Sequence, residues 1–274
     1  MKEKKVSANM EIVCGLFDHT KQGYYKHRKF LEKEQQLIDR IIPEVTKKRG
    51  DQPCVGVRKL QYMIAEEGII VGRDKLFNIL KSYGMLSEVY RRKCRTSTGS
   101  CSKYPNLIKA IGPAQRVGEI IASDITYLLT KKGFVYLSLT SDHFSDAILG
   151  HSLQRDLGKQ GPLIALHTAM TILGKTEPGI HHSDHGSQYT STLFQETLGK
   201  YGLLTSMTGI GKCYDNAKAE RINGILKHEL GLKKIFKDYE EALLYVKDAI
   251  KIYNRERLII TKGYKTPYEI LSAA

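Results

Sequence analysis

The stretch Ile121-Ala122-Ser123-Asp124-Ile125-Thr126-Tyr127 places one carboxylate inside a run of β-branched and aromatic residues, a composition that predicts a strand. A charged side chain in an apolar strand needs a cation, a polar partner or water. Outward from this strand, expected at 117–129, the pattern predicts further strands at 134–140, 146–153, 179–182 and 203–207. It also predicts helices at 159–173, 191–201, from 216 onward, and 239–254.

Two more carboxylates stand at informative places. Asp184 follows the short apolar strand, in His182-Ser183-Asp184-His185-Gly186-Ser187-Gln188-Tyr189, and Glu220 lies near the start of a helix that opens at Asp215-Asn216. Taken alone, Asp124 could be an edge residue, Asp184 an Asx-turn residue and Glu220 a solvated helix residue. Together, two strand-end aspartates and one helical glutamate can converge on a pair of hard divalent cations, which prefer oxygen ligands.

Five motifs in order, with 35 residues between the second and third carboxylates, make the chain resemble the OrfB-type transposases of bacterial insertion sequences. They are Asp124-Ile125-Thr126-Tyr127, His182-Ser183-Asp184-x-Gly186-Ser187-Gln188-Tyr189, Tyr214-Asp215-Asn216-Ala217-x-x-Glu220, Tyr253-Asn254-x-x-Arg257 and Lys265-Thr266-Pro267-x-Glu269. Three antiparallel strands followed by alternating helices and strands is also the order of an RNase H-like fold. We therefore expect an α/β, RNase H-like, retroviral-integrase-like catalytic core preceded by a small all-helical region.

The resemblance implies a DNA transposase that cleaves the 3′ ends of its element and joins them to target DNA. It implies that Asp124, Asp184 and Glu220 hold two Mg²⁺ or Mn²⁺ ions. It also implies a homo-multimer on paired DNA ends, and an OrfA-type partner or a frameshift fusion with one. The chain departs from the family pattern at three places: Ile121 replaces a tryptophan, Asp146 replaces an arginine, and Ile259 lies where a histidine is expected.

Charge and composition agree with a nucleic-acid partner. The net charge of the chain is +14, and residues 1–115 contain 23 Lys and Arg against 12 Asp and Glu, a net of +11. Basic surfaces favour polyanions, although they also serve solubility alone. No apolar run approaches the roughly 20 residues of a membrane span, and no apolar signal follows the first residues, so we expect a cytoplasmic protein. Five scattered cysteines without a Cys-x-x-Cys pair argue against a zinc site.

The sequence divides into four predicted regions, three of which lie before residue 116. A helical segment is expected over 1–50, with helices at 8–33 and 31–50 and Thr20 as a possible N-cap, and a helix-turn-helix-like module over 51–89. A basic linker is expected over 90–115, either lying on DNA phosphates or merely solvated, and the catalytic core over 116–274.

Further site residues follow from helical spacing and from the motifs. Asn216, Glu220, Asn223 and Lys227 share one helix face, which could meet a metal and a phosphate backbone or could simply be solvated; Asn216 could instead cap the helix. The candidate DNA contacts are Lys227, Asn216, Asn223, Gln188, Tyr189, Arg58, Lys59, Arg91 and Arg92. Asp142 is expected either to support the metal ligands or to form a turn. His181, His182 and His185 are poor evidence for zinc.

Two alternatives stay open on sequence alone. One is an RNase H-like nuclease or resolvase without strand transfer. The other is a non-catalytic DNA-binding protein that uses only the N-terminal half, against which the intact set of carboxylates argues.

Overall fold

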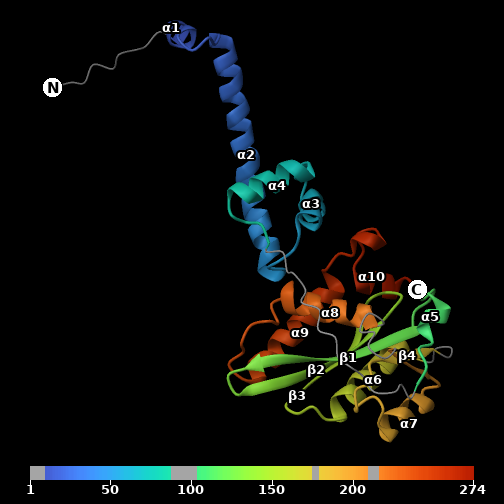
Figure 1. Ribbon diagram of the computed structural model, residues 1–274. Coiled ribbons are helices and arrows are strands. Elements are labelled where there is room, and N and C mark those ends of the chain that lie inside the picture. The colour runs from blue at the N-terminus through green and yellow to red at the C-terminus, as the bar shows by residue number, and fades with distance from the viewer. Residues whose placement is uncertain (1–9, 88–103, 175–178, 209–215) are drawn as a thin grey trace. The chain divides into compact units, whose positions relative to one another are not determined.

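The computed structural model describes residues 10–87, 104–174, 179–208 and 216–274 (Figure 1). The chain divides into two compact units, residues 1–50 with 60–86 and residues 51–59 with 87–274. Each unit has its own hydrophobic core. None of the described helices is both long enough and apolar enough to span a bilayer.

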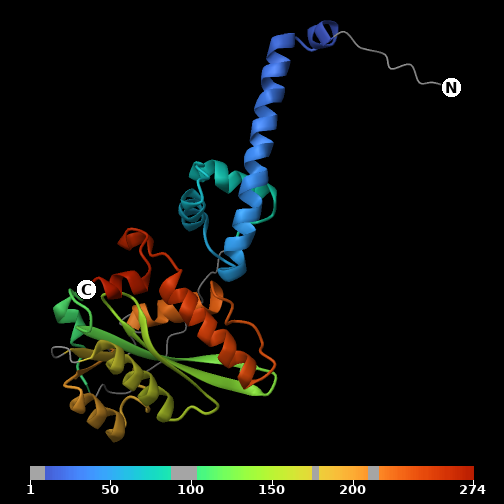
Figure 2. The same cartoon turned by 180° about the vertical axis from the view of Figure 1, so that it is seen from behind.

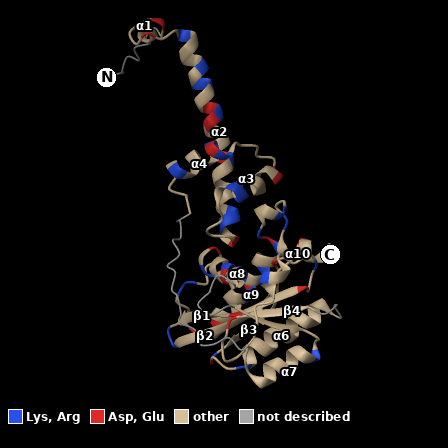
Figure 3. Ribbon diagram, turned by 45° about the vertical axis from the view of Figure 1, so that its right-hand side comes forward, with Lys and Arg blue, Asp and Glu red and all other residues tan. Residues whose placement is uncertain are grey.

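The first unit is helical. Its elements are α1 (Met10–Gly15), α2 (Lys21–Asp51), α3 (Val57–Glu66) and α4 (Arg73–Ser82), of which α2 and α3 extend past the unit's boundary. Their apolar stripes meet in a core of fully buried side chains: Ile41, Val45, Leu60, Ile64, Leu76 and Leu80. Basic side chains occupy the first turns of α2, and basic and acidic side chains are mixed along the rest, which is consistent with a helix that is mostly exposed (Figure 3). The helix-turn-helix outline of α3 and α4 follows from these two short helices and the turn at Gly68, whose φ is 75°.

The helix boundary predicted at 31–33 is wrong. One helix, α2, runs from Lys21 to Asp51 across this boundary, where residues 24–42 contain neither glycine nor proline to interrupt it. The N-cap expected at Thr20 is confirmed, since its hydroxyl accepts a hydrogen bond from the Gly23 N–H at 3.0 Å.

The second unit is built on one five-stranded sheet. The strands are β1 (Ile120–Thr130), β2 (Gly133–Asp142), β3 (Ile148–Gln154), β4 (Ile180–Ser183) and β5 (Leu204–Met207). Their order in the sheet is β3-β2-β1-β4-β5, with β1, β2 and β3 antiparallel and with β4 and β5 parallel to β1. This mixed topology confirms the predicted α/β, RNase H-like core.

The helices of this unit lie on both sides of the sheet (Figures 1 and 2). They are α5 (Ile108–Ile111), α6 (Gln160–Leu173), α7 (Thr192–Lys200), α8 (Ala217–His228), α9 (Tyr239–Arg255), the 3₁₀ turn η2 (Ile260–Lys262) and α10 (Pro267–Ser272). One core cluster joins β1, β2 and β3 to α8 and α9, and a second joins the sheet to α6 and α7. On one side the backbones approach closely: a Cβ on Gly150 would lie 1.9 Å from the Ala165 carbonyl oxygen of α6.

Side-chain alternation decides which face of the sheet carries the candidate site. Leu128, Leu137 and Leu139 point into the core shared with α8 and α9. Asp124 pairs with Leu139 across the β1–β2 ladder, and paired residues on neighbouring strands point to the same face. Asp124 therefore points toward α8.

Candidate active site

Parallel pairing of β1 with β4 brings the two aspartates to the same level of the sheet. Ala122 pairs with His182; two residues further on, Asp124 lies within β1 and Asp184 directly follows the end of β4. Neighbouring strands are about 4.8 Å apart, and residues at matching positions of parallel strands point to the same side. The two carboxylates are thus adjacent even though 59 residues separate them in the sequence.

Asp124 is half-buried and held by two hydrogen bonds. Its Oδ1 accepts from the Ile125 N–H at 2.9 Å, and its Oδ2 accepts from Nδ2 of Asn223 at 2.7 Å. Burial and the charges of Asp184 and Glu220 nevertheless raise the pKa of Asp124 to about 7, because these effects exceed the opposing influence of the two hydrogen bonds. Burial is the largest cause of this shift in pKa, and the neighbouring carboxylates of Asp184 and Glu220 add to it.

Asp184 occupies the exposed end of the site. Its Oδ1 accepts a hydrogen bond from the Gly186 N–H at 2.9 Å, which is the Asx-turn arrangement that the sequence allows. The turn and the metal-ligand interpretations are compatible, because this bond uses one oxygen and leaves lone pairs on both.

The helix α8 supplies the third carboxylate. Asn223 of this helix contacts Asp124, and Glu220 lies one turn earlier on the same face, so Glu220 faces the site as well. Glu220 is half-buried, and its charge contributes to the raised pKa of Asp124. Lys227 follows one turn after Asn223. Burial lowers the pKa of Lys227, while the Asp124 carboxylate acts in the opposite direction, which places the ammonium group within electrostatic range of the site.

The donor set of this site suits a hard divalent cation in its chemistry. All three candidate ligands are carboxylates, and their excess negative charge would be relieved by a cation. The described residues contain no group of three or more His, Cys, Asp or Glu side chains already close enough together to hold a metal ion. In the structure the carboxylates are therefore neighbours but do not form a closed coordination shell.

The nearby histidines do not form a metal site. His181 and His182 are buried and share hydrogen bonds with the hydroxyls of Ser123 and Ser206, each at 2.9 Å. His185 bonds to a backbone carbonyl at 2.6 Å. His181 and His182 are neighbours on β4 and point to opposite faces of the sheet, so these side chains are not a set of convergent ligands.

Several candidate DNA contacts lie in positions that exclude direct contact. Tyr189 is only 2% exposed, with its ring packed against Phe194, and Lys59 is buried with its ammonium 3.5 Å from Glu229. Burial lowers the pKa of Lys59 to about 8, and the positive charge of Arg257 adds to this effect. For Tyr189 and Lys59 the prediction of a DNA contact is corrected, because packing and ion pairing already use these side chains.

Three amides are also internal. Gln188 is buried and donates from Nε2 to the Leu157 carbonyl at 3.0 Å. Asn223 is buried against Asp124, as described above. Asn216 stands at the N-cap position of α8, but its side chain makes no capping hydrogen bond and its Oδ1 is buried without a partner, so the predicted side-chain cap is wrong. These three predicted DNA contacts are corrected to interior positions.

The remaining predicted residues have mixed outcomes. Arg58 is exposed and stays a candidate for DNA contact, whereas Arg91 and Arg92 lie outside the described residues. The Asp142 carboxylate accepts from the Gly118 N–H at 2.9 Å and from the N–H and hydroxyl of Ser145, each at 2.6 Å. Of the two roles considered for Asp142, the structure favours the turn.

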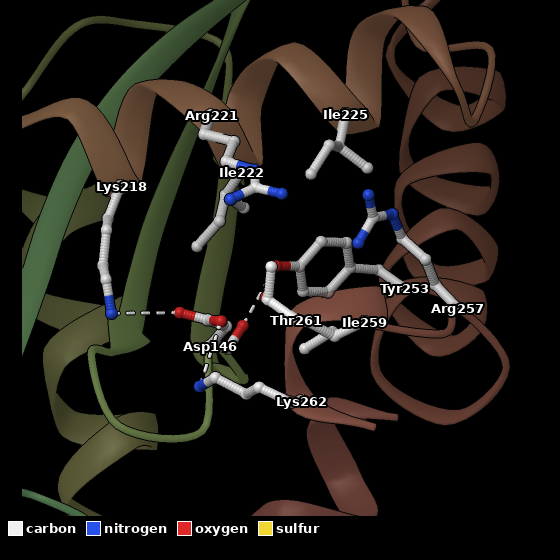
Figure 4. Close-up of a pocket in the computed structure, with 10 residues that line it drawn as sticks. All are labelled: Asp146, Lys218, Arg221, Ile222, Ile225, Tyr253, Arg257, Ile259, Thr261 and Lys262. Carbon is white, nitrogen blue, oxygen red and sulfur yellow. Dashed lines mark hydrogen bonds and ion pairs between the residues drawn. The ribbon is translucent and has the colours of Figure 1, made fainter. Parts of the chain in front are cut away.

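Sequence reasoning missed a positively charged pocket beside α8 (Figure 4). Lys218, Arg221, Ile222 and Ile225 line it, at spacings of three, one and three residues. With about 100° per residue, this stripe lies about 180° around the helix from Glu220 and Asn223. The helical period was a signal that could have revealed the stripe from the sequence.

Comparison with known proteins supplies the family. Two integrase core domain profiles match residues 114–213 and 201–267. The chain is 31% identical over 252 residues to an uncharacterized 31 kDa protein of insertion element IS600 from Shigella sonnei, covering 89% of this chain and 92% of that one. It is also 31% identical over 215 residues to the transposase of IS629 from Shigella sonnei, covering 78% of this chain and 72% of that one.

Two further similarities extend the comparison. A putative transposase of IS986/IS6110 from Mycobacterium tuberculosis is 29% identical over 264 residues, covering 91% of this chain and 94% of that one. Among solved structures, the HTLV-2 integrase catalytic core aligns with a TM-score of 0.46 and 24% identity, covering 56% of this chain and 95% of that one. On the sequence matches, the chain belongs to the insertion-sequence transposases that carry an integrase core domain.

Proposed function

We propose that this transposase cleaves DNA at the 3′ ends of its insertion sequence and joins the freed ends to target DNA, with Asp124, Asp184 and Glu220 as the catalytic residues. The single observation that carries the assignment is the crowding of these carboxylates. Asp124 lies in β1 and Asp184 directly follows the adjacent parallel strand β4, and the pKa of Asp124 is raised to about 7 by burial and by the charges of Asp184 and Glu220.

Two Mg²⁺ or Mn²⁺ ions are the cofactors that this carboxylate set would hold. When bound, such a pair activates a nucleophilic oxygen and stabilises the leaving oxygen of a phosphodiester. The ligands come from three different elements, β1, the end of β4 and α8, so the fold rather than a local loop sets their positions.

Hydrogen bonds from neighbouring groups orient two of these carboxylates for metal binding. The Asn223 amide and the Ile125 N–H fix the orientation of Asp124, and the Gly186 N–H fixes that of Asp184. An oriented ligand loses less freedom when it binds, and partners of this kind sustain metal affinity. Lys227, within electrostatic range of Asp124, is suited to neutralise a phosphate of the strand being processed.

The partners proposed for this reaction are the DNA of the element ends and of the target, further copies of the chain on paired ends, and an OrfA-type protein. The charge distribution supports the first of these, since residues 1–115 carry a net +11. Arg58, Arg91, Arg92 and Lys227 are the cationic side chains proposed to contact phosphates.

The test uses the full chain and the terminal inverted repeats read from DNA that flanks the gene. Asp124→Asn, Asp184→Asn and Glu220→Gln should each abolish 3′-end cleavage and strand transfer in Mg²⁺ or Mn²⁺ while keeping DNA affinity. Glu240→Gln is the matched control, because Glu240 is an exposed helical carboxylate whose side chain is 70% exposed in an ion pair with Arg155. Mn²⁺ binding, followed by electron paramagnetic resonance, should weaken in the three variants and persist in the control.

The outcomes separate the competing functions. Near-normal strand transfer by any one of the three variants would remove that residue from the catalytic set. Metal-dependent nicking without joining, even with paired ends, would favour an RNase H-like nuclease. DNA binding without any cleavage by the parent chain would favour a non-catalytic protein.

A further inference from the structure

A pocket of about 200 Å³ opens beside α8, and Figure 4 shows the residues that line it. Residues from α8, from the end of α9, from the η2 segment and from the turn between β2 and β3 line it. They are Asp146, Lys218, Arg221, Ile222, Ile225, Tyr253, Arg257, Ile259, Thr261 and Lys262. All of them belong to the second unit.

The lining carries a strong excess of positive charge. Four cationic side chains face one carboxylate, Asp146, whose two oxygens lie 3.2 Å from Nζ of Lys218 and 3.1 Å from Nζ of Lys262. Arg257 pairs outside the pocket with Glu229, at 3.0 Å. Asp146 can therefore balance only part of the charge around the cavity.

Arg221 is the cation that the protein leaves available. Among the residues that the structure describes, it makes neither a hydrogen bond nor an ion pair, and its guanidinium group extends along the pocket from α8 (Figure 4). A guanidinium presents a planar fork of donors that matches the oxygens of a phosphate. The two lysines beside it add point charges to the same space.

The volume of the pocket and the residues that line it limit the kind of ligand that can bind there. A cavity of about 200 Å³ is below the range of about 300–1,000 Å³ that is typical of sites for drug-sized ligands. It suits one phosphate group with part of its sugar. Ile222, Ile225, Ile259 and the ring of Tyr253 provide an apolar wall for the sugar, while the cations would receive the phosphate oxygens.

We propose that this pocket binds a backbone phosphate of a DNA strand, with Arg221 as the principal contact and Lys218 and Lys262 in support. The DNA source rests on the proposed function; the phosphate chemistry does not. At about 100° per residue, Arg221 projects from α8 about 100° around the helix from Glu220, and the other α8 residues that line the pocket lie further round still. The bound phosphate is thus distinct from the one that reacts, and one helix contacts the DNA at two separate places.

Asp146 should lower the affinity of this pocket for phosphate. Its carboxylate occupies the two lysines, so it competes with an incoming phosphate for their charge. Its backbone φ is 62°, a left-handed conformation that Asp and Asn tolerate better than other residues with side chains. Asp146→Asn should therefore keep the local conformation, remove the competing charge and strengthen phosphate binding.

The experiment measures two properties of the full chain, each in the parent, Arg221→Gln and Asp146→Asn. The first is the rise in Tm with inorganic phosphate, relative to chloride at equal ionic strength. The second is the dependence of duplex DNA affinity on salt, with a duplex of arbitrary sequence. Arg155→Gln is the matched control, because Arg155 is an exposed arginine at the other end of β3, already paired with Glu240. Phosphate stabilises many proteins by general exclusion, so only differences between variants are informative.

Arg221→Gln should lose the specific part of the Tm rise and lower the salt slope of DNA binding by about 0.9, which is roughly an 8-fold loss of affinity at 0.1 M salt. Asp146→Asn should increase the Tm rise, and Arg155→Gln should change neither property. Cleavage by the carboxylate variants does not enter these measurements, so the proposed catalytic function can fail or stand independently.

Three results would overturn the proposal. If Arg221→Gln keeps both properties, the pocket binds no phosphate. If it loses the Tm rise but keeps the salt slope, the pocket takes free phosphate and not DNA. If it keeps the Tm rise but lowers the slope, Arg221 contacts DNA from the surface of α8 and the pocket is not the site.

Discussion

Replacing Asn223 with alanine should separate the stability of the fold from the activity of the site. Asn223 donates from Nδ2 to Oδ2 of Asp124 at 2.7 Å, while its own Oδ1 is buried without a partner. The substitution therefore removes one favourable contact and one unfavourable group together, at a position that is 8% exposed.

The magnitudes of these two effects nearly cancel for folding. A hydrogen bond to a charged group contributes about 1.5–3 kcal/mol, and a buried polar atom without a partner costs about 1–3 kcal/mol. We expect the free energy of unfolding of Asn223→Ala to lie within about 1.5 kcal/mol of the parent. Activity has no such compensation. Loss of a partner that orients a metal ligand typically lowers metal affinity or activity by about 10–100-fold, and the same loss is expected here in Mn²⁺ affinity and in 3′-end cleavage.

Asn254→Ala is the matched control with the opposite expectation. The Asn254 side chain accepts from the Ile148 N–H at 2.9 Å and donates to the Ile148 carbonyl at 2.8 Å, so its removal leaves two backbone groups of β3 without partners. It should lower the free energy of unfolding by about 2–4 kcal/mol and leave cleavage per folded molecule unchanged. Denaturant unfolding and cleavage are measured on both variants. Cleavage within twofold of the parent in Asn223→Ala, or a stability loss as large as that of Asn254→Ala, would refute the reasoning.

Three further predictions concern packing, DNA contact and acid stability. Gly150→Ala should lower the free energy of unfolding by about 3 kcal/mol or more, since its Cβ would lie 1.9 Å from a backbone oxygen of α6; a normal denaturation midpoint would contradict this. Lys227→Ala should lower the salt slope of DNA binding by about 1 and leave the denaturation midpoint unchanged, whereas an unchanged slope would remove Lys227 from the DNA contacts. Burial lowers the pKa of His143 and of His181 to about 3, so both stay neutral in the fold and become charged on unfolding. Their contribution to the free energy of unfolding is therefore full above pH 6.5 and is lost as the pH falls from 6.5 toward 3, by about 1.4 kcal/mol for each histidine at pH 5.5. His181→Gln should make the free energy of unfolding, measured by urea titration, depend less on pH, and an unaltered dependence would count against this prediction.

The sequence predicts the elements of the second unit well because its strands and helices carry clear periodic patterns. The strand with Asp124 was expected at 117–129 and is found at Ile120–Thr130, and the helix expected at 159–173 is found at Gln160–Leu173. The short helix α10 was not predicted, although its capping box between Thr266 and Glu269 can be read from the residues. Its six residues are too few to show a helical period.

The roles of individual polar side chains were harder to predict, because helical spacing gives a shared face but not what covers it. Asn223 and Lys227 were placed on one face with Glu220, and the structure keeps them there. Yet that face packs against β1 at Asn223, so the amide serves Asp124 and is not open to DNA. Tyr189 was misassigned for a similar reason. The motif identifies the residue but does not show that it is buried, because its burial depends on Phe194, which belongs to a different element.

The residues of the C-terminal motif Tyr253-Asn254-x-x-Arg257 make structural contacts and do not form part of the carboxylate site. The Tyr253 hydroxyl donates to the Asp146 carbonyl at 3.0 Å, Asn254 bonds to Ile148 in β3, and Arg257 pairs with Glu229 just after α8. None of these contacts reaches the three carboxylates. Instead they fasten α9 to the β2–β3 turn, to β3 and to the end of α8, and α8 is the helix that carries both Glu220 and Arg221. The carboxylate face and the phosphate pocket therefore share one helix, and Arg221→Gln and Asn223→Ala should each affect only one of them.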